Sequence, residues 1–166
     1  DLSARNAYGE TVTQMRQVLE SSGVKVYTGA PYKLVLTDEQ ENQRILSYAG
    51  AGRTGEYQVT TVLNYDIRGQ NNLDLLSDKL EVQKIFMHDG NNLVGSDQEA
   101  ATARGETRRE LIQRMMLRLQ QLTPAQLDQL QQTADARAKA EAAALEAAQK
   151  AEAETPRQSP LELPKQ

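Results

Sequence analysis

Strict alternation of two kinds of side chain marks one segment of this chain before any other. From residue 57 to residue 68 every second position belongs to a largely apolar series, and the positions between belong to a more polar one. The first series is Tyr57, Val59, Thr61, Leu63, Tyr65 and Ile67, and the second is Gln58, Thr60, Val62, Asn64, Asp66 and Arg68. A period of two predicts a β-strand with one face turned to a core and the other left polar.

Four other segments carry weaker strand signals. Residues 24–27 and 32–36 are short β candidates separated by a Gly-Ala-Pro break, and residues 42–49 lead through a glycine-rich loop into the long strand. Residues 42–49 and the long strand together predict a hairpin. In residues 79–88 apolar side chains fall on both sides, which predicts either a bulge or burial of both faces. The apolar residues concerned are Leu80, Val82 and Phe86 on one side and Ile85 and Met87 on the other.

Helical periodicity lies on either side of these strands. Residues 8–22 carry apolar side chains three and four positions apart and stop at Gly23, and residues 97–121 carry a second, wider apolar stripe. Thr123, Pro124 and Gln126 have the spacing of a capped helix start. Beyond it, residues 134–154 consist mainly of Ala, Glu, Lys and Gln, which predicts a solitary or fraying helix. The prolines of residues 155–166 predict a disordered tail.

These elements predict an α+β fold of two layers, with two helices packed on one face of a mixed, roughly four-stranded sheet. An Ala-rich C-terminal helix and the tail are added to it. We therefore divide the chain into a globular part (1–122), the C-terminal helix (123–154) and the tail (155–166). The other face of the sheet stays polar, so it can meet water or a polar partner.

Composition removes several functions. The chain has no Cys, so a thiolate nucleophile and a thiolate metal site are both excluded. Its formal net charge of −4 argues against general capture of nucleic acid, and no apolar run approaches the length of a membrane span. Asp97 and Glu99 lack metal-site spacing and suit a helix N-terminus. His88 and Asp89 are adjacent in a strand and point to opposite faces, so we expect no catalytic residues, no metal and no cofactor.

The glycine-rich loop is the best local candidate for binding. Gly50, Gly52 and Gly55 form a G-x-G-x-x-G string, but a strand follows where dinucleotide binding requires a helix. Successive glycines can still turn N–H groups toward an anion, Arg53 can add a bidentate guanidinium, and Arg44 can assist from the incoming strand. The alternative is that the glycines only relax the hairpin and that Arg53 is an ordinary surface residue.

The ordered succession of these segments resembles the LptE family of lipopolysaccharide-assembly lipoproteins. The resemblance covers about residues 2–122 and is carried by the strand at 32–36, the Thr-Gly-Glu-Tyr-Gln-Val entry at 54–59, the strand at 80–87 and the arginine-bearing helix to Leu122. It implies two helices on one side of a four-stranded mixed sheet. It also implies a lipid-modified Cys and the start of the first strand before Asp1, with residues 2–4 ending that strand.

The function implied by the resemblance is non-enzymatic. The protein would be anchored by its N-terminal lipid to the outer membrane on the periplasmic side. It would plug the LptD barrel in a one-to-one complex, assist the assembly of LptD and bind lipopolysaccharide during export. Wide barrels have polar interiors, which suits the mean hydropathy of −0.65.

We assign lipopolysaccharide binding to the hairpin and barrel contact to the polar sheet face. The lipopolysaccharide residues are Arg53, Arg44, Gly50, Gly52 and Gly55, and the barrel residues are Gln58, Thr60, Asn64 and Arg68. The arginines of the 97–121 helix have nearby glutamates, which favours a solvated, salt-linked face over contact with phosphate or the barrel wall. The alternative function is a free periplasmic protein–protein adaptor that binds no glycolipid.

Overall fold

A computed structural model describes residues 1–6, 9–49 and 54–154 of the chain. Gly50, Gly52 and Arg53 of the predicted anion site lie outside the described residues, and so does the predicted tail at 155–166. The elements in chain order are β1 (Leu2–Ala4), α1 (Glu10–Ser21), β2 (Lys33–Ala49), β3 (Thr54–Arg68), the 3-10 turn η1 (Gln70–Asn72), β4 (Asp74–Asp89), α2 (Leu93–Gln121) and α3 (Pro124–Glu154).

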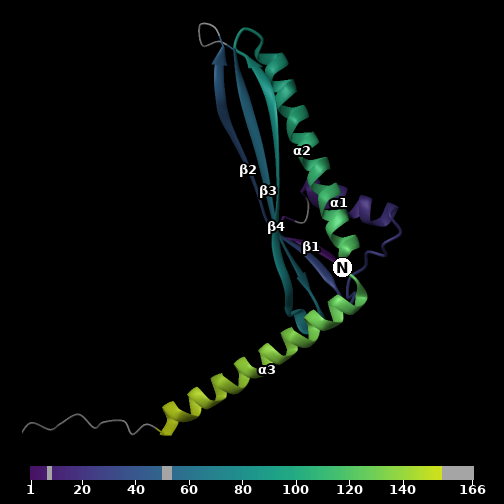
Figure 1. Ribbon diagram of the computed structural model, residues 1–166, viewed down its shortest axis with the longest axis vertical. Helices are drawn as coiled ribbons and strands as arrows, with labels where there is room; N and C mark the ends of the chain where they lie inside the picture. The colour runs from purple at the N-terminus through teal and green to yellow at the C-terminus, as the bar shows by residue number, and fades with distance from the viewer. Residues whose placement is uncertain (7–8, 50–53, 155–166) are drawn as a thin grey trace, which may run out of the picture.

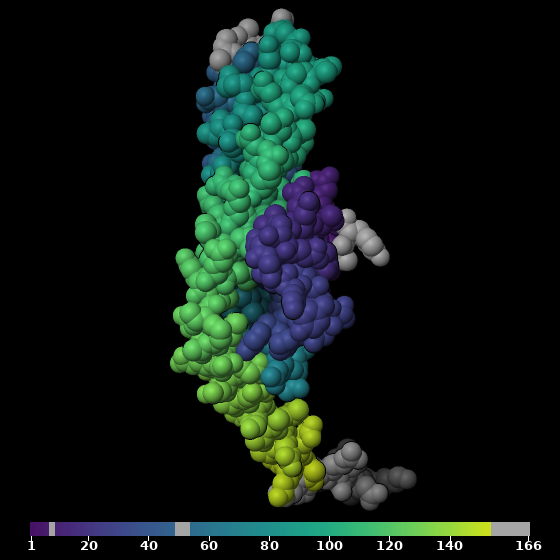
Figure 2. Space-filling view, turned by 90° about the vertical axis from the view of Figure 1, so that its right-hand side faces the viewer, coloured from purple at the N-terminus to yellow at the C-terminus, as the bar shows by residue number. Residues whose placement is uncertain are grey.

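The four strands form one mixed sheet in the order β1-β2-β3-β4 (Figure 1). β1 runs parallel to the beginning of β2, whereas β2, β3 and β4 are antiparallel neighbours. Helices α1 and α2 lie side by side on the same face of this sheet (Figure 2). The predicted α+β fold class is therefore confirmed.

The apolar series of β3 forms the centre of the packed layer. Val59, Leu63 and Tyr65 are at most 2% exposed, and they face the helices. From the helices, Met15 of α1 and Leu111 of α2 are fully buried in contact with this core. Because alternate residues of a strand point to opposite faces, the second series of β3 forms an open face on the other side of the sheet. We call this the outer face.

The predicted strand at 24–27 is wrong. These residues are irregular, and Val24 and Tyr27 are 46% and 54% exposed. Gly23 has φ 82° and ends α1, with the Val24 amide donating to the carbonyl oxygen of Leu19 at 3.0 Å. The place beside the beginning of β2 is taken by β1, so residues 24–27 do not pair there.

The segments 32–36 and 42–49 are not separate strands but parts of the 17-residue β2. The polar residues between them continue the ladder with β3, with register shifts at Leu36/Asp38 and Ile45/Ser47. Backbone hydrogen bonds make this ladder, so the polar side chains do not interrupt it. The hairpin itself is as predicted.

The mixed pattern of residues 79–88 has a different cause from the one expected. β4 pairs with β3 without a register shift from Asp89 to Leu76, so there is no bulge in the predicted segment. Only one face of this segment is buried, since Ile85 and Met87 on the other face are 56% and 45% exposed. They lie on the outer face, which neither α1 nor α2 covers (Figure 1). The predicted strand is confirmed, but the predicted bulge or burial of both faces is wrong.

Helix α2 begins at Leu93, four residues before the predicted start, where Asn92 accepts a capping hydrogen bond from the Gly95 amide at 3.1 Å. Helix α3 begins as predicted, because the Thr123 side chain and Gln126 form the expected reciprocal cap. Its first turns dock on the sheet, and Ala134 is still buried, so the predicted solitary helix is wrong at its start. From residue 139 to residue 153 every side chain is exposed.

Candidate functional site

The outer face carries a chain of hydrogen bonds that crosses three strands. Arg44 Nε of β2 donates to Gln58 Oε1 of β3 at 2.7 Å, Gln58 Nε2 donates to Gln83 Oε1 of β4, and Gln83 Nε2 donates to Glu81 Oε1 at 2.7 Å. Gln58 is only 6% exposed, although no helix lies over it. Its neighbours therefore cover it and satisfy its amide, and the chain of bonds stiffens the face at this level.

Arg44 is the first residue in this series of hydrogen bonds. It is exposed and keeps hydrogen-bond donors free. Its Nε is used by Gln58, and within the described residues its two terminal nitrogens make no hydrogen bond or salt bridge. A guanidinium offers five donors in a planar fork, so Arg44 can still bind an oxyanion in a bidentate manner. Two carboxylates lie nearby. One is Glu81, the last acceptor in the series of hydrogen bonds, and the other is Glu56, which accepts a hydrogen bond from Ser47 Oγ at 3.0 Å.

Exposed apolar side chains lie in the same rows as these polar groups. Arg44 is paired with Gln58, which in turn is paired with Ile85, so the three side chains form one row across the sheet. Met87 follows on β4, opposite Glu56. We call Arg44, Gln58, Ile85 and Met87 the outer patch. A cation beside exposed aliphatic groups is suited to an amphiphilic ligand that carries an anion next to hydrocarbon.

Gly55 does not join Arg44 in this patch. It lies in β3, paired with Tyr48 and His88, and its missing side chain would point to the helix-covered face. A Cβ there would approach the carbonyl oxygen of Ser47 to 2.7 Å. Gly55 thus allows close approach of β2 at its register shift, a packing reason for glycine that the loop pattern did not reveal.

The residues expected to contact a barrel are spread along β3. Thr60 and Asn64 are half-buried on the outer face, in agreement with the alternation. Arg68, at the far end of the strand, is neutralised by Asp66 at 3.2 Å and Asp74 at 2.6 Å. With a rise of about 3.3 Å per residue, Arg68 is roughly 33 Å from Gln58 along β3, so these residues form a long surface and not a single site.

The arginines of α2 pair mainly with other elements. Arg104 donates to Glu41 of β2 at 2.7 Å, Arg108 pairs with Glu10 of α1, and Arg118 pairs with Asp78 of β4. Arg114 instead pairs with a neighbour on its own helix, Glu110, at 2.6 Å. The salt-linked face that the sequence predicts is present, but most of it fastens α2 to its neighbours.

His88 and Asp89 do not form an acid–base pair. The His88 ring packs on Tyr57 with centroids 4.9 Å apart, and the Asp89 carboxylate accepts from the Asn91 amide at 2.9 Å. Among the residues that the structure describes, no cluster of three His, Cys, Asp or Glu side chains could hold a metal ion. None of the described helices is both long and apolar enough to span a membrane.

The structure also contains an apolar hollow, which the sequence interpretation missed. It lies at the opposite end of the sheet, where α1, α2 and α3 approach the first residues of β2, and its volume is about 370 Å³. The irregular segment after α1 forms one of its walls. The only sequence signal was the high proportion of leucine near the ends of the helices, which is also what an ordinary core produces.

The fold is a two-layer α+β domain with one packed and one open sheet face (Figure 1). A family model described as "LptE: Lipopolysaccharide-assembly" matches residues 2–119. The chain belongs to this family, as the resemblance of its segments indicated, and its role is in lipopolysaccharide assembly. A comparison with curated protein sequences finds no match.

Solved structures of bacterial lipoproteins share the fold at low sequence identity. Rare lipoprotein B from Shewanella oneidensis has a TM-score of 0.64 and 19% identity over 72% of this chain and 91% of its own. A minor lipoprotein from Acinetobacter baumannii has a TM-score of 0.58 and 15% identity over 69% and 85%. Lipoprotein B from Nitrosomonas europaea has a TM-score of 0.59 and 14% identity over 69% and 77%.

Proposed function

We propose that this protein binds lipopolysaccharide at the hairpin end of its sheet while it is enclosed by the LptD barrel. The observation that carries the proposal is the row formed by Arg44, Gln58 and Ile85. Lipid A presents phosphates beside acyl chains, and this row presents free guanidinium donors beside exposed aliphatic carbon. The proposed site includes Arg53, Gly50 and Gly52, which follow β2 in the sequence, and Gly55, which allows the two strands to lie close together.

The proposed enclosure rests on the outer face of β3. Gln58, Thr60, Asn64 and Arg68 give this face polar groups along its whole length, which complement the polar interior of a wide barrel. In this role the protein is a non-enzymatic lipoprotein, held to the outer membrane on the periplasmic side by an N-terminal lipid, in a one-to-one complex with LptD. It assists LptD assembly because a folded insert gives the barrel a surface to close around.

Charge reversal tests the lipid site. We expect Arg44→Glu and Arg53→Glu each to weaken capture of purified lipopolysaccharide by roughly tenfold, since each replaces a guanidinium–phosphate pair by repulsion. The circular dichroism spectrum should not change. Lys139→Glu is the matched control, because it makes the same charge change on an exposed part of α3. Equal capture by all three variants would remove the site from the hairpin end.

Site-specific photo-cross-linking tests the enclosure in the full-length protein. A cross-linker at Thr60 or Asn64 should capture LptD, and one at Leu145 on the exposed part of α3 should not. Co-purification should give a one-to-one complex from detergent-extracted outer membranes. A free periplasmic adaptor would instead remain in the soluble fraction with its N-terminus intact, and Thr60 would cross-link to soluble proteins only.

A further inference from the structure

The hollow at the far end of the sheet is larger than a packing defect. Protein interiors are close-packed, with few voids larger than a water molecule, whereas this hollow measures about 370 Å³. Its volume is at the lower end of the range of small-molecule pockets, about 300–1,000 Å³. It therefore has room for one slender ligand but not for a multi-chain lipid.

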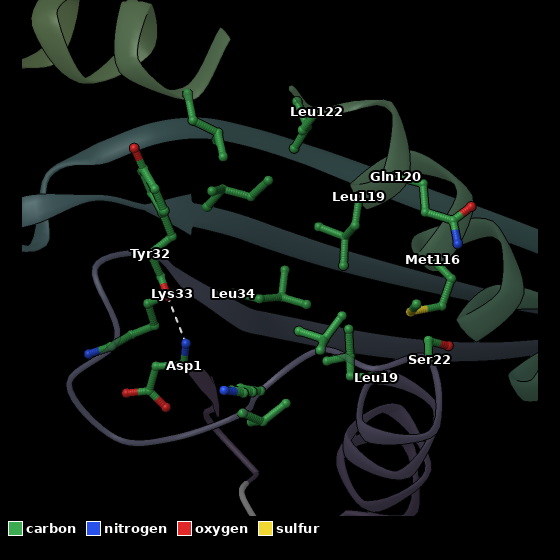
Figure 3. Close-up of a pocket in the computed structure, with 15 residues that line it drawn as sticks. Asp1, Leu19, Ser22, Tyr32, Lys33, Leu34, Met116, Leu119, Gln120 and Leu122 are labelled. Atoms are coloured by element: carbon green, nitrogen blue, oxygen red, sulfur yellow. Dashed lines mark hydrogen bonds between the residues drawn. The ribbon is translucent and has the colours of Figure 1, made fainter. Parts of the chain in front are cut away.

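The interior of the hollow is hydrocarbon from four elements. Leu19 of α1, Leu34 of β2, Ile67 of β3 and Met116 of α2 form its deep wall, and each is between 5% and 8% exposed. Half-buried leucines close it from the C-terminal side, and Figure 3 shows Leu34, Leu119 and Leu122 around one apolar space. Hydrocarbon walls of this kind favour an apolar occupant, because binding removes the apolar surfaces of both from water.

The mouth carries positive charge that the protein does not use. Lys25 lines the hollow and makes no salt bridge or side-chain hydrogen bond with any described residue, whereas Lys33 is paired with Arg68, so its side chain belongs to the outer face. Asp1 supplies the one carboxylate in the lining, and its backbone nitrogen donates to the Tyr32 carbonyl oxygen at 2.7 Å (Figure 3). An unpaired ammonium group beside an apolar hollow complements a ligand with a hydrocarbon chain and an anionic end.

The wall that carries Lys25 is irregular chain. Residues 24–27 belong to no helix or strand, and they are followed by Gly29 with φ 87°. Val24 lines the hollow yet is 46% exposed, so apolar surface continues from the interior to the opening. A wall without ladder partners can shift to admit a chain at less cost than a strand or a helix could.

We propose that this hollow binds a long-chain fatty acid, with the hydrocarbon among the leucines and the carboxylate at Lys25. This site is separate from the outer patch and does not depend on lipopolysaccharide binding there. The single carboxylate matches the single ammonium group of Lys25, and the limited volume favours a single chain.

Methionine-methyl NMR with myristate as the probe, kept below its micellar concentration, tests the proposal without any substitution. The chain has four methionines, of which Met116 lines the hollow and Met87 lies on the outer patch. We expect the Met116 methyl signal to shift on titration and the Met87 signal to stay in place. A shift of Met87 alone would put the hydrocarbon on the outer patch, and an unchanged spectrum would mean that the hollow binds no fatty acid; either result overturns the proposal.

Calorimetry on a pair of variants tests the location again. Leu119→Trp fills the hollow and should weaken myristate binding by roughly tenfold or more, while Leu117→Trp, at a 60% exposed position outside the lining of the same helix, should not. Lys25→Glu should weaken binding of myristate but not of its methyl ester, and Lys33→Glu, which makes the same charge change on the outer face, is its control. Equal effects of the two tryptophans, or equal loss of ester and acid, would contradict the assignment. Lipopolysaccharide capture by the same variants should remain unchanged, which separates this site from the proposed function.

Discussion

The hydroxyl of Thr61 on β3 donates to the hydroxyl of Thr107 on α2 across 3.1 Å, and both residues are at most 3% exposed. The Thr107 hydroxyl in turn donates a hydrogen bond to the carbonyl oxygen of Arg104 at 2.9 Å, so each hydroxyl has a partner. The pair lies where two apolar clusters meet, one containing Leu63 and the other Val59. It fastens the helix to the long strand in the middle of the packed layer.

Substitution of this pair should be strongly non-additive. Thr107→Val leaves the Thr61 hydroxyl buried without an acceptor, so we expect a loss of about 1–3 kcal/mol in the free energy of unfolding. Replacing both threonines by valine removes the orphaned group together with its partner, and the double variant should be more stable than Thr107→Val. Urea unfolding of the four proteins measures the cycle. A double variant that loses the sum of the single losses would contradict the coupling.

Two glycines offer opposite outcomes for the same change to alanine. In Gly55→Ala the new methyl group meets the Ser47 carbonyl oxygen, a backbone atom that cannot move alone, so we expect about 1–3 kcal/mol of destabilisation. Gly105 of α2 has nothing within 4 Å of the added carbon, and Gly105→Ala should stabilise the helix by about 0.5–1 kcal/mol. Thermal unfolding compares them. A neutral Gly55→Ala would show that the strands can separate there freely.

The sequence predicted the layers well because their signal is local. The alternation of β3 and the helical stripes each reflect one element meeting one core, and they correctly place Val59, Leu63 and Met15 inside. Patterns that depend on neighbours were misread. Ile85 and Met87 are exposed apolar residues on an uncovered face, and no one-dimensional pattern distinguishes them from a second buried stripe.

Sequence patterns predicted the candidate sites less well than the layers. The row of Arg44, Gln58 and Ile85 exists only through the register of three strands, which spacing along the chain does not give. The apolar hollow similarly depends on where three helix ends meet. Gln58 was expected to face a partner, and its burial by Arg44 and Gln83 follows from side-chain length, not from periodicity.

The start of α3 depends on a reciprocal cap that a single substitution can remove. Thr123 Oγ1 accepts from the Gln126 amide at 3.3 Å, and Gln126 Oε1 accepts from the Thr123 amide at 2.9 Å. Thr123→Ala should cost about 0.5–2 kcal/mol and speed amide exchange in the first turn of α3. Thr133→Ala is the control, because its hydroxyl only donates to the Gln129 carbonyl within the helix. Similar exchange in both variants would mean that docking alone holds this end.

The ion pair between Lys84 of β4 and Glu106 of α2, with Nζ and Oε2 2.8 Å apart, should make a pH-dependent contribution to stability. The hydrogen bond from Lys84 lowers the pKa of Glu106, with a smaller contribution from the charge of Arg109. The same bond raises the pKa of Lys84, to which the charge of Glu110 adds. A depressed carboxyl pKa stabilises the folded state above the usual glutamate value of about 4.3, and a raised lysine pKa does so below about 10.4. The contribution is therefore present between these values and is lost as the pH falls through the folded pKa of Glu106 or rises through that of Lys84.

Lys84→Met should move the Glu106 pKa upward, toward the ordinary glutamate range. Carboxyl-carbon NMR titration measures this directly, and the difference in unfolding free energy between wild type and variant should shrink as the pH falls. Both side chains are exposed, so the effect on stability at neutral pH will be small and will fall further with added salt. Lys139→Met, on the exposed part of α3, controls for the loss of one positive charge. If Glu106 titrated identically in all three proteins, Lys84 could not be the group that holds its pKa down, and the contact between β4 and α2 would be one of packing alone.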